Sequence, residues 1–130
     1  MNRIFKQSLN LISIMENEKL SVRDFIRKYE EYFSEIPAGS LIAPECRNIQ
    51  KYQESGYIFL IGSYIYFKSE DEPVTWFQRR RFAEFHQYET LYQKTISTSI
   101  SRRFQSLKDL RIYLENLQEE HHENCTDRKF

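Results

Sequence analysis

The sequence predicts a single α+β domain, with an N-terminal helical hairpin, a small antiparallel sheet and C-terminal helices. Three observations favour this class: apolar residues at helical spacing near both ends, two aromatic and β-branched runs joined by Gly62-Ser63, and a length of 130 residues. That length is typical of about one domain. We expect residues 1–118 to form one globular domain and residues 119–130 to form a polar tail.

Two amphipathic helices are expected at the N-terminus. Apolar residues recur at helical spacing from Asn2 to Asn17. Ser21 then precedes Asp24 by three residues, which is the pattern of a capping box, and an apolar stripe runs from Val22 to Ile36. Pro37 ends this second helix, because proline cannot continue the ladder of amide donors. The two helices are expected to pair as an antiparallel hairpin.

The middle of the chain is predicted to hold a short helix followed by a β-hairpin. The helix begins at Pro44 and runs to Ser55, with Gly56 as its left-handed closing residue. The strands are Tyr57–Ile61 and Tyr64–Phe67. Gly62-Ser63 between them suit a type II′ turn, because glycine supplies the positive φ that its first central position requires.

The second half of the chain adds one strand and two helices to this prediction. An acidic turn at Ser69–Pro73 leads into a third strand, Val74–Arg80, and then a helix over Arg81–Lys94. Ser106 and Asp109 repeat the capping-box pattern and begin the last amphipathic helix.

Composition excludes several classes of function. Three glycines cannot form a phosphate-binding loop or a dinucleotide fingerprint. Cys46 and Cys125 are too few for a zinc ribbon or a disulfide framework, so reduced thiols with no assigned role are expected. No apolar run is long enough to span a bilayer, and the first residues lack a cleavage site for a secretory leader. We therefore expect a cytoplasmic protein without a membrane partner.

Catalytic and metal-binding constellations are not expected. His121 and His122 are adjacent, so on a helix they point about 100° apart. Cys46 and a distant His86 lack a third group that would orient them. The sequence therefore predicts a non-catalytic protein that needs no cofactor and holds no metal.

The charges are unevenly distributed although the formal net charge is zero. Residues 74–113 hold eight basic and three acidic side chains, and the run Trp76–Phe82 places three arginines among aromatic residues. This composition suits phosphate contacts and base stacking. An alternative function is therefore nucleic-acid binding, as in a small or phage-type regulatory protein, through the basic surface Arg79, Arg80, Arg81, Arg102 and Arg103.

Residues 11–33, LISIMENEKLSVRDFIRKYEEYF, resemble the opening of small bacterial immunity proteins of the colicin D immunity type and of related contact-dependent growth inhibition systems. Those proteins begin with a helix, a short polar turn and a Ser-x-x-Glu/Asp-Phe start to a second helix. The corresponding residues here are Ser21, Asp24 and Phe25. The resemblance implies a protein that binds a cognate toxin domain and occludes its active site. The expected hairpin at residues 57–67 departs from the all-helical members of this group.

An inhibitor of this kind needs exposed carboxylates and aromatic anchors, because nuclease toxins present basic clefts. Two acidic segments supply them, one on the second expected helix and one in the expected turn after the hairpin. The predicted partner-binding residues are Glu30, Glu31, Tyr32, Glu35, Glu70, Asp71 and Glu72.

Overall fold

Helices are the regular elements of this protein wherever its structure is described. The computed structural model describes residues 2–48, 50–70 and 89–127, and this part of the chain contains no strand. The α+β class and the small antiparallel sheet predicted from the sequence are therefore wrong. The long helices are α1 (Asn2–Glu18), α5 (Glu54–Glu70) and α7 (Leu107–Asp127). The short ones are α2 (Val22–Lys28), α3 (Glu30–Phe33), α4 (Ala38–Leu41) and the 3₁₀ helices η1 (Pro44–Cys46) and η3 (Ile100–Arg102).

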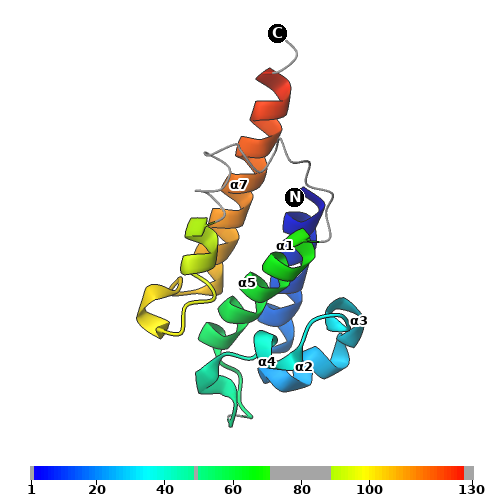
Figure 1. The fold of residues 1–130 in the computed structure, drawn as a ribbon, viewed down its shortest axis with the longest axis vertical. Coiled ribbons are helices and arrows are strands. Elements are labelled where there is room, and N and C mark those ends of the chain that lie inside the picture. Colours follow the sequence, from blue (N-terminus) through cyan, green and yellow to red (C-terminus); the bar gives the residue numbers. More distant parts are fainter. Residues whose placement is uncertain (1, 49, 71–88, 128–130) are drawn as a thin grey trace.

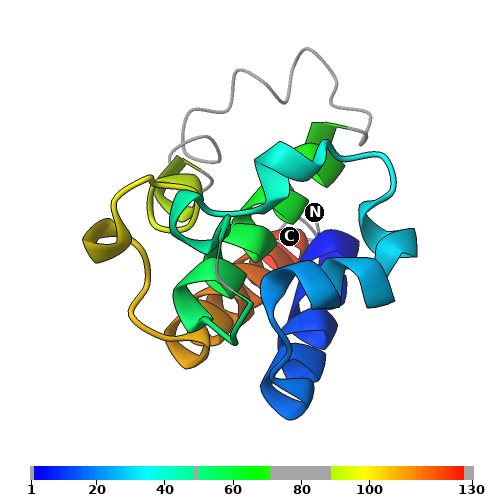
Figure 2. The same ribbon diagram turned by 90° about the horizontal axis from the view of Figure 1, so that it is seen from below.

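The three long helices pack against one another and form the body of the fold. α1 contacts both α5 and α7, and it runs in the opposite direction to them (Figure 1). The short helices α2 to α4 and the segment 95–106 lie on opposite sides of α5, as the view from below also shows (Figure 2). α5 is thus covered by neighbours around most of its circumference.

This central position explains why α5 was predicted to be a β-hairpin. From Gly56 to Ile65 every residue is buried except Phe59, which is half-buried. A helix that is buried all round has no polar face, so its sequence loses the 3.6-residue period that marks an amphipathic helix. The strands predicted at Tyr57–Ile61 and Tyr64–Phe67 are accordingly one continuous helix.

The glycines of α5 serve close packing, and neither adopts the positive φ of a turn. A Cβ at Gly62 would lie 2.1 Å from Oγ1 of Thr95, and one at Gly56 would lie 2.4 Å from Sγ of Cys46. Both positions therefore need a residue without a side chain. The type II′ turn predicted at Gly62-Ser63 and the helix end predicted at Gly56 are both wrong.

The N-terminal helix has the predicted extent to within one residue, and the N-cap after it is confirmed. Ser21 Oγ accepts a hydrogen bond from the backbone amide of Asp24, 3.2 Å away. The second helix is shorter than predicted, because Tyr29 leaves the helical region at φ −113° and ψ 39° and separates α2 from α3. This break places the Tyr29 hydroxyl 2.8 Å from Oε1 of Glu18.

Two further predictions about the N-terminal half are wrong. α1 packs chiefly on α5 and α7, whereas α2 packs on α3 and α5, so the first two helices do not pair along their lengths as a hairpin. The helix predicted from Pro44 to Ser55 is only the single 3₁₀ turn η1, followed by a turn and loop that lead into α5. Buried Cys46 and Ala43 tie this segment to the core.

The last helix begins as predicted and extends further than predicted. Ser106 Oγ accepts from the amide of Asp109 at 3.1 Å, and Oε1 of Glu54 accepts from the amide of Leu107 at 2.5 Å. A carboxylate is favourable at this position because it faces the positive end of the helix dipole. α7 continues to Asp127, through most of the segment predicted to be a polar tail.

Two predicted elements fall largely outside the described residues. The third strand, Val74–Arg80, lies entirely outside them, as does most of the helix predicted over Arg81–Lys94. Residues 89–93, at the end of that predicted helix, are helical.

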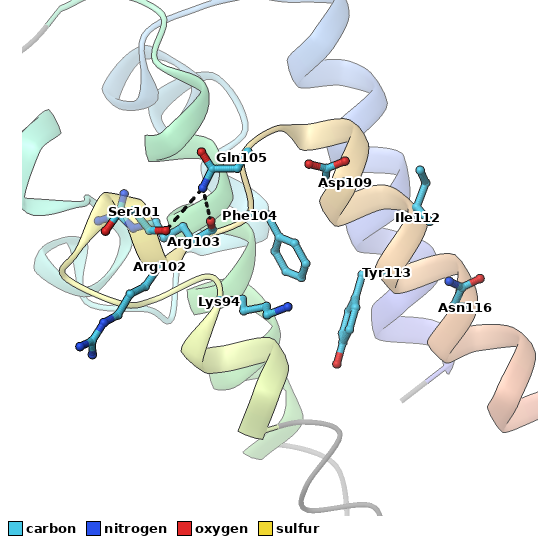
Figure 3. A pocket seen from close by; sticks show the side chains of 10 residues that line it. All are labelled: Lys94, Ser101, Arg102, Arg103, Phe104, Gln105, Asp109, Ile112, Tyr113 and Asn116. Carbon is cyan, nitrogen blue, oxygen red and sulfur yellow. Dashed lines mark hydrogen bonds between the residues drawn. The ribbon is translucent and has the colours of Figure 1, made fainter.

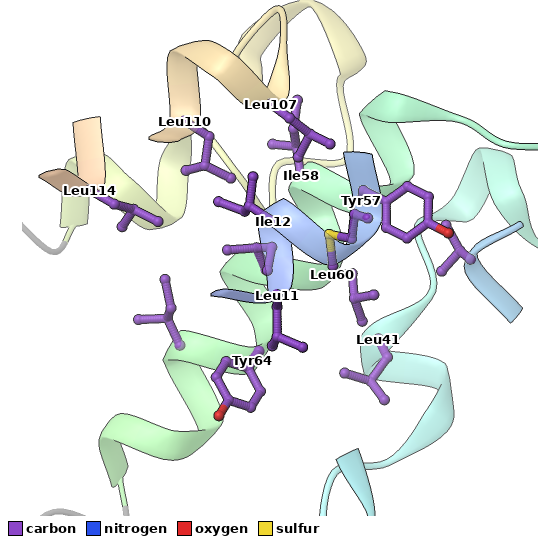
Figure 4. Packing of buried hydrophobic residues seen from close by; sticks show 14 of the residues in the cluster. Leu11, Ile12, Leu41, Tyr57, Ile58, Leu60, Tyr64, Leu107, Leu110 and Leu114 are labelled. Atoms are coloured by element: carbon purple, nitrogen blue, oxygen red, sulfur yellow. The ribbon is translucent and has the colours of Figure 1, made fainter. Parts of the chain in front are cut away.

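The core lies between the three long helices. In Figure 4 the leucines of α7, Leu107 and Leu110 among them, point toward α1 and α5. Tyr57 and Tyr64 of α5 are fully buried, and each hydroxyl has a partner. The Tyr57 hydroxyl donates to the backbone carbonyls of Leu20 and Ser21, and that of Tyr64 donates to Oε1 of Gln7 at 2.8 Å.

Candidate functional site: an acidic face and a cationic aromatic pocket

The helix α3 presents exposed carboxylates from a firmly anchored position. Phe33 is buried, with its ring centroid 5.8 Å from that of Tyr64 in α5. Glu30 and Glu31 on α3, and Glu35 just after it, are exposed as predicted. We call these three glutamates the acidic face.

Tyr32 contributes only part of its ring to this surface. It is half-buried, and its ring lies 6.4 Å from the rings of both Tyr29 and Phe33. The expected aromatic anchor is therefore joined to the core beside the acidic face, so a partner could contact only its exposed edge.

The carboxylates of the acidic face have no neutralising partner within the described part of the chain. Among the described residues, no basic side chain lies within ion-pair distance of Glu30, Glu31 or Glu35. Lys28, the nearest preceding cation in the sequence, instead pairs with Glu18 at 2.8 Å. Residues 29–46 contain no lysine or arginine. The acidic face therefore carries a local negative potential.

By contrast, Glu16, Glu18 and Glu45 each have a basic partner within the fold. Glu16 pairs with Arg111 at 2.7 Å, and Glu45 pairs with Arg103. Hydrogen bonds from Lys28 and Tyr29 lower the pKa of Glu18. These paired carboxylates connect elements of the fold, whereas those of the acidic face are left to meet solvent or a partner.

The second predicted acidic segment does not form the expected turn between strands where it is described. Glu70 is the last residue of α5, and Asp71 and Glu72 lie outside the described residues. The described part of this segment thus lies on α5, whereas the acidic face lies on and just after α3.

The alternative basic surface is divided. Arg79, Arg80 and Arg81 lie outside the described residues, and Arg102 is exposed on η3. Arg103 is 2% exposed. Its guanidinium donates to both carboxylate oxygens of Glu45, and its hydrogen bonds to the backbone carbonyls of Ser97 and Ser55 measure 2.8 and 3.2 Å. Arg103 is therefore occupied inside the protein and unavailable to a phosphate backbone.

Sequence reasoning could not find the pair formed by Glu45 and Arg103. The two residues are 58 positions apart, so no local spacing indicates that they meet. Arg103 also lies over the ring of Phe59, 5.1 Å from its centroid. The pair fastens η1 and the segment 95–106 to α5.

A shallow pocket of about 450 Å³ lies between the segment 94–105 and α7 (Figure 3). Its walls include the rings of Phe104 and Tyr113, whose centroids are 5.2 Å apart. Lys94 Nζ lies 5.6 Å from the centroid of Phe104. Sequence reasoning did not single out these three side chains. Their only sequence signal is that they lie within the basic and aromatic stretch already described.

Cys46 does not have the properties of a reactive thiol. It is buried, and Sγ lies 3.4 Å from Oε1 of Gln53. Burial, together with the charge of Glu45, raises the pKa of its thiol, so the thiolate is disfavoured. His86, which could have served as its base, lies outside the described residues.

The described residues contain no group of three or more His, Cys, Asp or Glu side chains placed to hold a metal ion. None of their helices combines the length and apolar character needed to cross a membrane.

Comparison of the chain with protein-family models, with curated proteins and with solved structures gives no match in any of the three. The functions of the acidic face and of the pocket are therefore inferred from the chemistry of their own residues.

Proposed function

We propose that this chain is a non-catalytic binding protein that contacts a basic surface of another protein through the acidic face. The observation that supports this most strongly is that Glu30, Glu31 and Glu35 are exposed and have no basic partner among the described residues. Charge complementarity of this kind accelerates association and selects partners.

The anchoring of α3 also supports the proposal. Phe33 holds the helix on Tyr64 of α5, so the carboxylates are presented by a fixed scaffold. A preorganised surface loses less conformational entropy on binding than a flexible one.

The partner we propose is a toxin domain with a basic active-site cleft, which the protein would occlude. This narrower proposal depends on the resemblance of residues 11–33 to immunity proteins. The helical fold agrees better with the all-helical members of that group than the β-hairpin predicted from the sequence did.

The test uses the protein product of the reading frame adjacent to this one, purified as a candidate toxin. Its affinity for the chain is measured by calorimetry over a salt series, with the wild type and the Glu31→Lys/Glu35→Lys variant. We expect the variant to bind at least about tenfold more weakly, a loss of about 1.4 kcal/mol. We also expect the salt dependence to flatten, because rim charges act mainly through screened attraction.

A matched control separates the acidic face from net charge. Glu115 is exposed on α7, so a Glu115→Lys variant changes charge on another helix. It is compared with the single variant Glu31→Lys. Equal weakening by the two variants would contradict the proposal, as would no effect of the double reversal on a complex that does form. Failure of the candidate toxin to bind at all would contradict the narrower proposal.

A further inference from the structure

The pocket between the segment 94–105 and α7 shares no residue with the acidic face and has the features of a ligand site. Its volume of about 450 Å³ lies in the range of pockets that take small molecules. Phe104 and Tyr113 give it an aromatic wall, and the exposed side chain of Ile112 extends this apolar surface along α7.

Lys94 supplies a positive charge inside this aromatic wall. Figure 3 shows its side chain extending toward the space between Phe104 and Tyr113. Nζ lies 5.6 Å from the Phe104 centroid, a distance at which the ring attracts the ammonium group. Within the described part of the chain Lys94 has no carboxylate partner. The ammonium group is thus attracted to the ring and available to an anion.

The loop that carries Phe104 is fixed by hydrogen bonds. Nε2 of Gln105 donates to the carbonyls of Ser101 and Arg103, at 3.5 and 3.0 Å. Arg103 is itself fastened by Glu45. The wall of the pocket is therefore preformed, which reduces the entropic cost of binding.

The remaining lining residues are polar and suit a ligand with several hydrogen-bonding groups. Asp109 and Asn116 lie along α7, where a carboxylate accepts from hydroxyl or N–H donors and an amide both donates and accepts. Arg102 is exposed at the rim, and in Figure 3 its side chain points away from the rings. It can meet only a group that extends out of the pocket.

We propose that this pocket binds a phosphorylated nucleoside. The phosphate contacts Lys94, while the base packs on Tyr113 and Ile112. Asp109 accepts from sugar hydroxyls or base N–H groups, and Asn116 reads the edge of the base. Inorganic phosphate alone would leave the aromatic wall unused, and an aromatic amino acid lacks the sugar hydroxyls and the base edge that Asp109 and Asn116 can bond. The ligand is either a free nucleotide or one unit of a single strand, since both present the same chemistry.

The experiment records ¹H–¹⁵N NMR spectra of the full chain titrated with AMP, UMP, adenosine, inorganic phosphate, L-phenylalanine and a short oligoadenylate. We expect saturable shifts at Lys94, Phe104 and Tyr113 with nucleotides or the oligonucleotide, and binding about tenfold weaker without the phosphate or without the base. If only the oligoadenylate saturates the site, the source is a strand. If mononucleotides saturate it equally, the source is a free nucleotide.

Three variants test the assignment of residues. We expect Lys94→Gln and Tyr113→Leu each to weaken binding about tenfold, and Lys108→Gln, on the same helix as Tyr113 but outside the pocket, to leave it unchanged. Thermal unfolding of each variant checks that it is folded. Because Lys94 is exposed, its variant remains informative even if Tyr113→Leu does not fold.

Three results would overturn the proposal. The first is no saturable shift with any nucleotide or with the oligonucleotide. The second is equal weakening by Lys94→Gln and Lys108→Gln, which indicates non-specific attraction to positive charge. The third is binding of L-phenylalanine as tightly as AMP. None of these bears on the acidic face, so the two proposals can fail separately.

Discussion

Replacing Arg103 with methionine removes the guanidinium that joins η1, α5 and the segment 95–106. The Arg103 side chain is fully buried and that of Glu45 is 19% exposed, so the substitution leaves a largely desolvated carboxylate without its cation. Removing one partner of a buried ion pair costs about 3–5 kcal/mol. The backbone carbonyls of Ser97 and Ser55 also lose a donor. We expect a loss of about 3–5 kcal/mol, a large fraction of the roughly 5–15 kcal/mol that stabilises a typical domain.

Urea denaturation followed by circular dichroism at 222 nm measures this loss. The control is the double variant Arg103→Met/Glu45→Leu, which removes both charges and leaves apolar side chains of similar size. It should be more stable than Arg103→Met alone, because the unpaired carboxylate is what makes the single change costly. A loss below about 1 kcal/mol for Arg103→Met, or a double variant no more stable than the single one, would refute the reasoning.

Further predictions concern pH, packing and caps. Burial raises the pKa of Glu45, but the hydrogen bonds and charge of Arg103, together with hydrogen bonds from the Glu45 amide and from Ser55, lower it below its ordinary value. The stabilisation from this ion pair is therefore present above the ordinary pKa of a glutamate. Acid titration of the wild type should show this stabilisation lost as the pH falls through the pKa of Glu45 in the folded protein. The Glu45→Gln variant should show no such loss. In urea melts, Gly62→Ala should cost about 1–3 kcal/mol through its clash with Thr95, despite the better helix propensity of alanine. A neutral or stabilising result would contradict the close approach. Ser106→Ala should cost about 1 kcal/mol by the same assay, and no loss would argue against the cap.

The features that sequence reasoning predicted correctly depend on local interactions. Ser21 and Ser106 cap helices because each hydroxyl reaches an amide three residues on, which is a relation visible in the sequence. α1 has a polar face that shows its period. Glu30, Glu31 and Glu35 were expected to be exposed as charged residues of one short acidic segment, and they are exposed.

The features that sequence reasoning missed depend on contacts between segments that are distant in the sequence. α5 carries no periodic signal because the fold surrounds it, and the need for Gly62 arises from Thr95, which is far away in the sequence. The contact between Glu45 and Arg103 and the pocket around Lys94 also exist only after the chain has folded. Local propensity cannot reveal such relations, because tertiary packing creates them.

The most direct test of this account is an NMR measurement of α5, on which both proposals depend. Tyr64 of α5 anchors the helix that carries the acidic face, and Gly62 seats Thr95 beside Lys94. We predict helical ¹³Cα shifts, amide–amide contacts between successive residues from Tyr57 to Ile65, and amide exchange among the slowest in the chain. Strand-type shifts with cross-strand contacts on either side of Gly62-Ser63 would contradict the account.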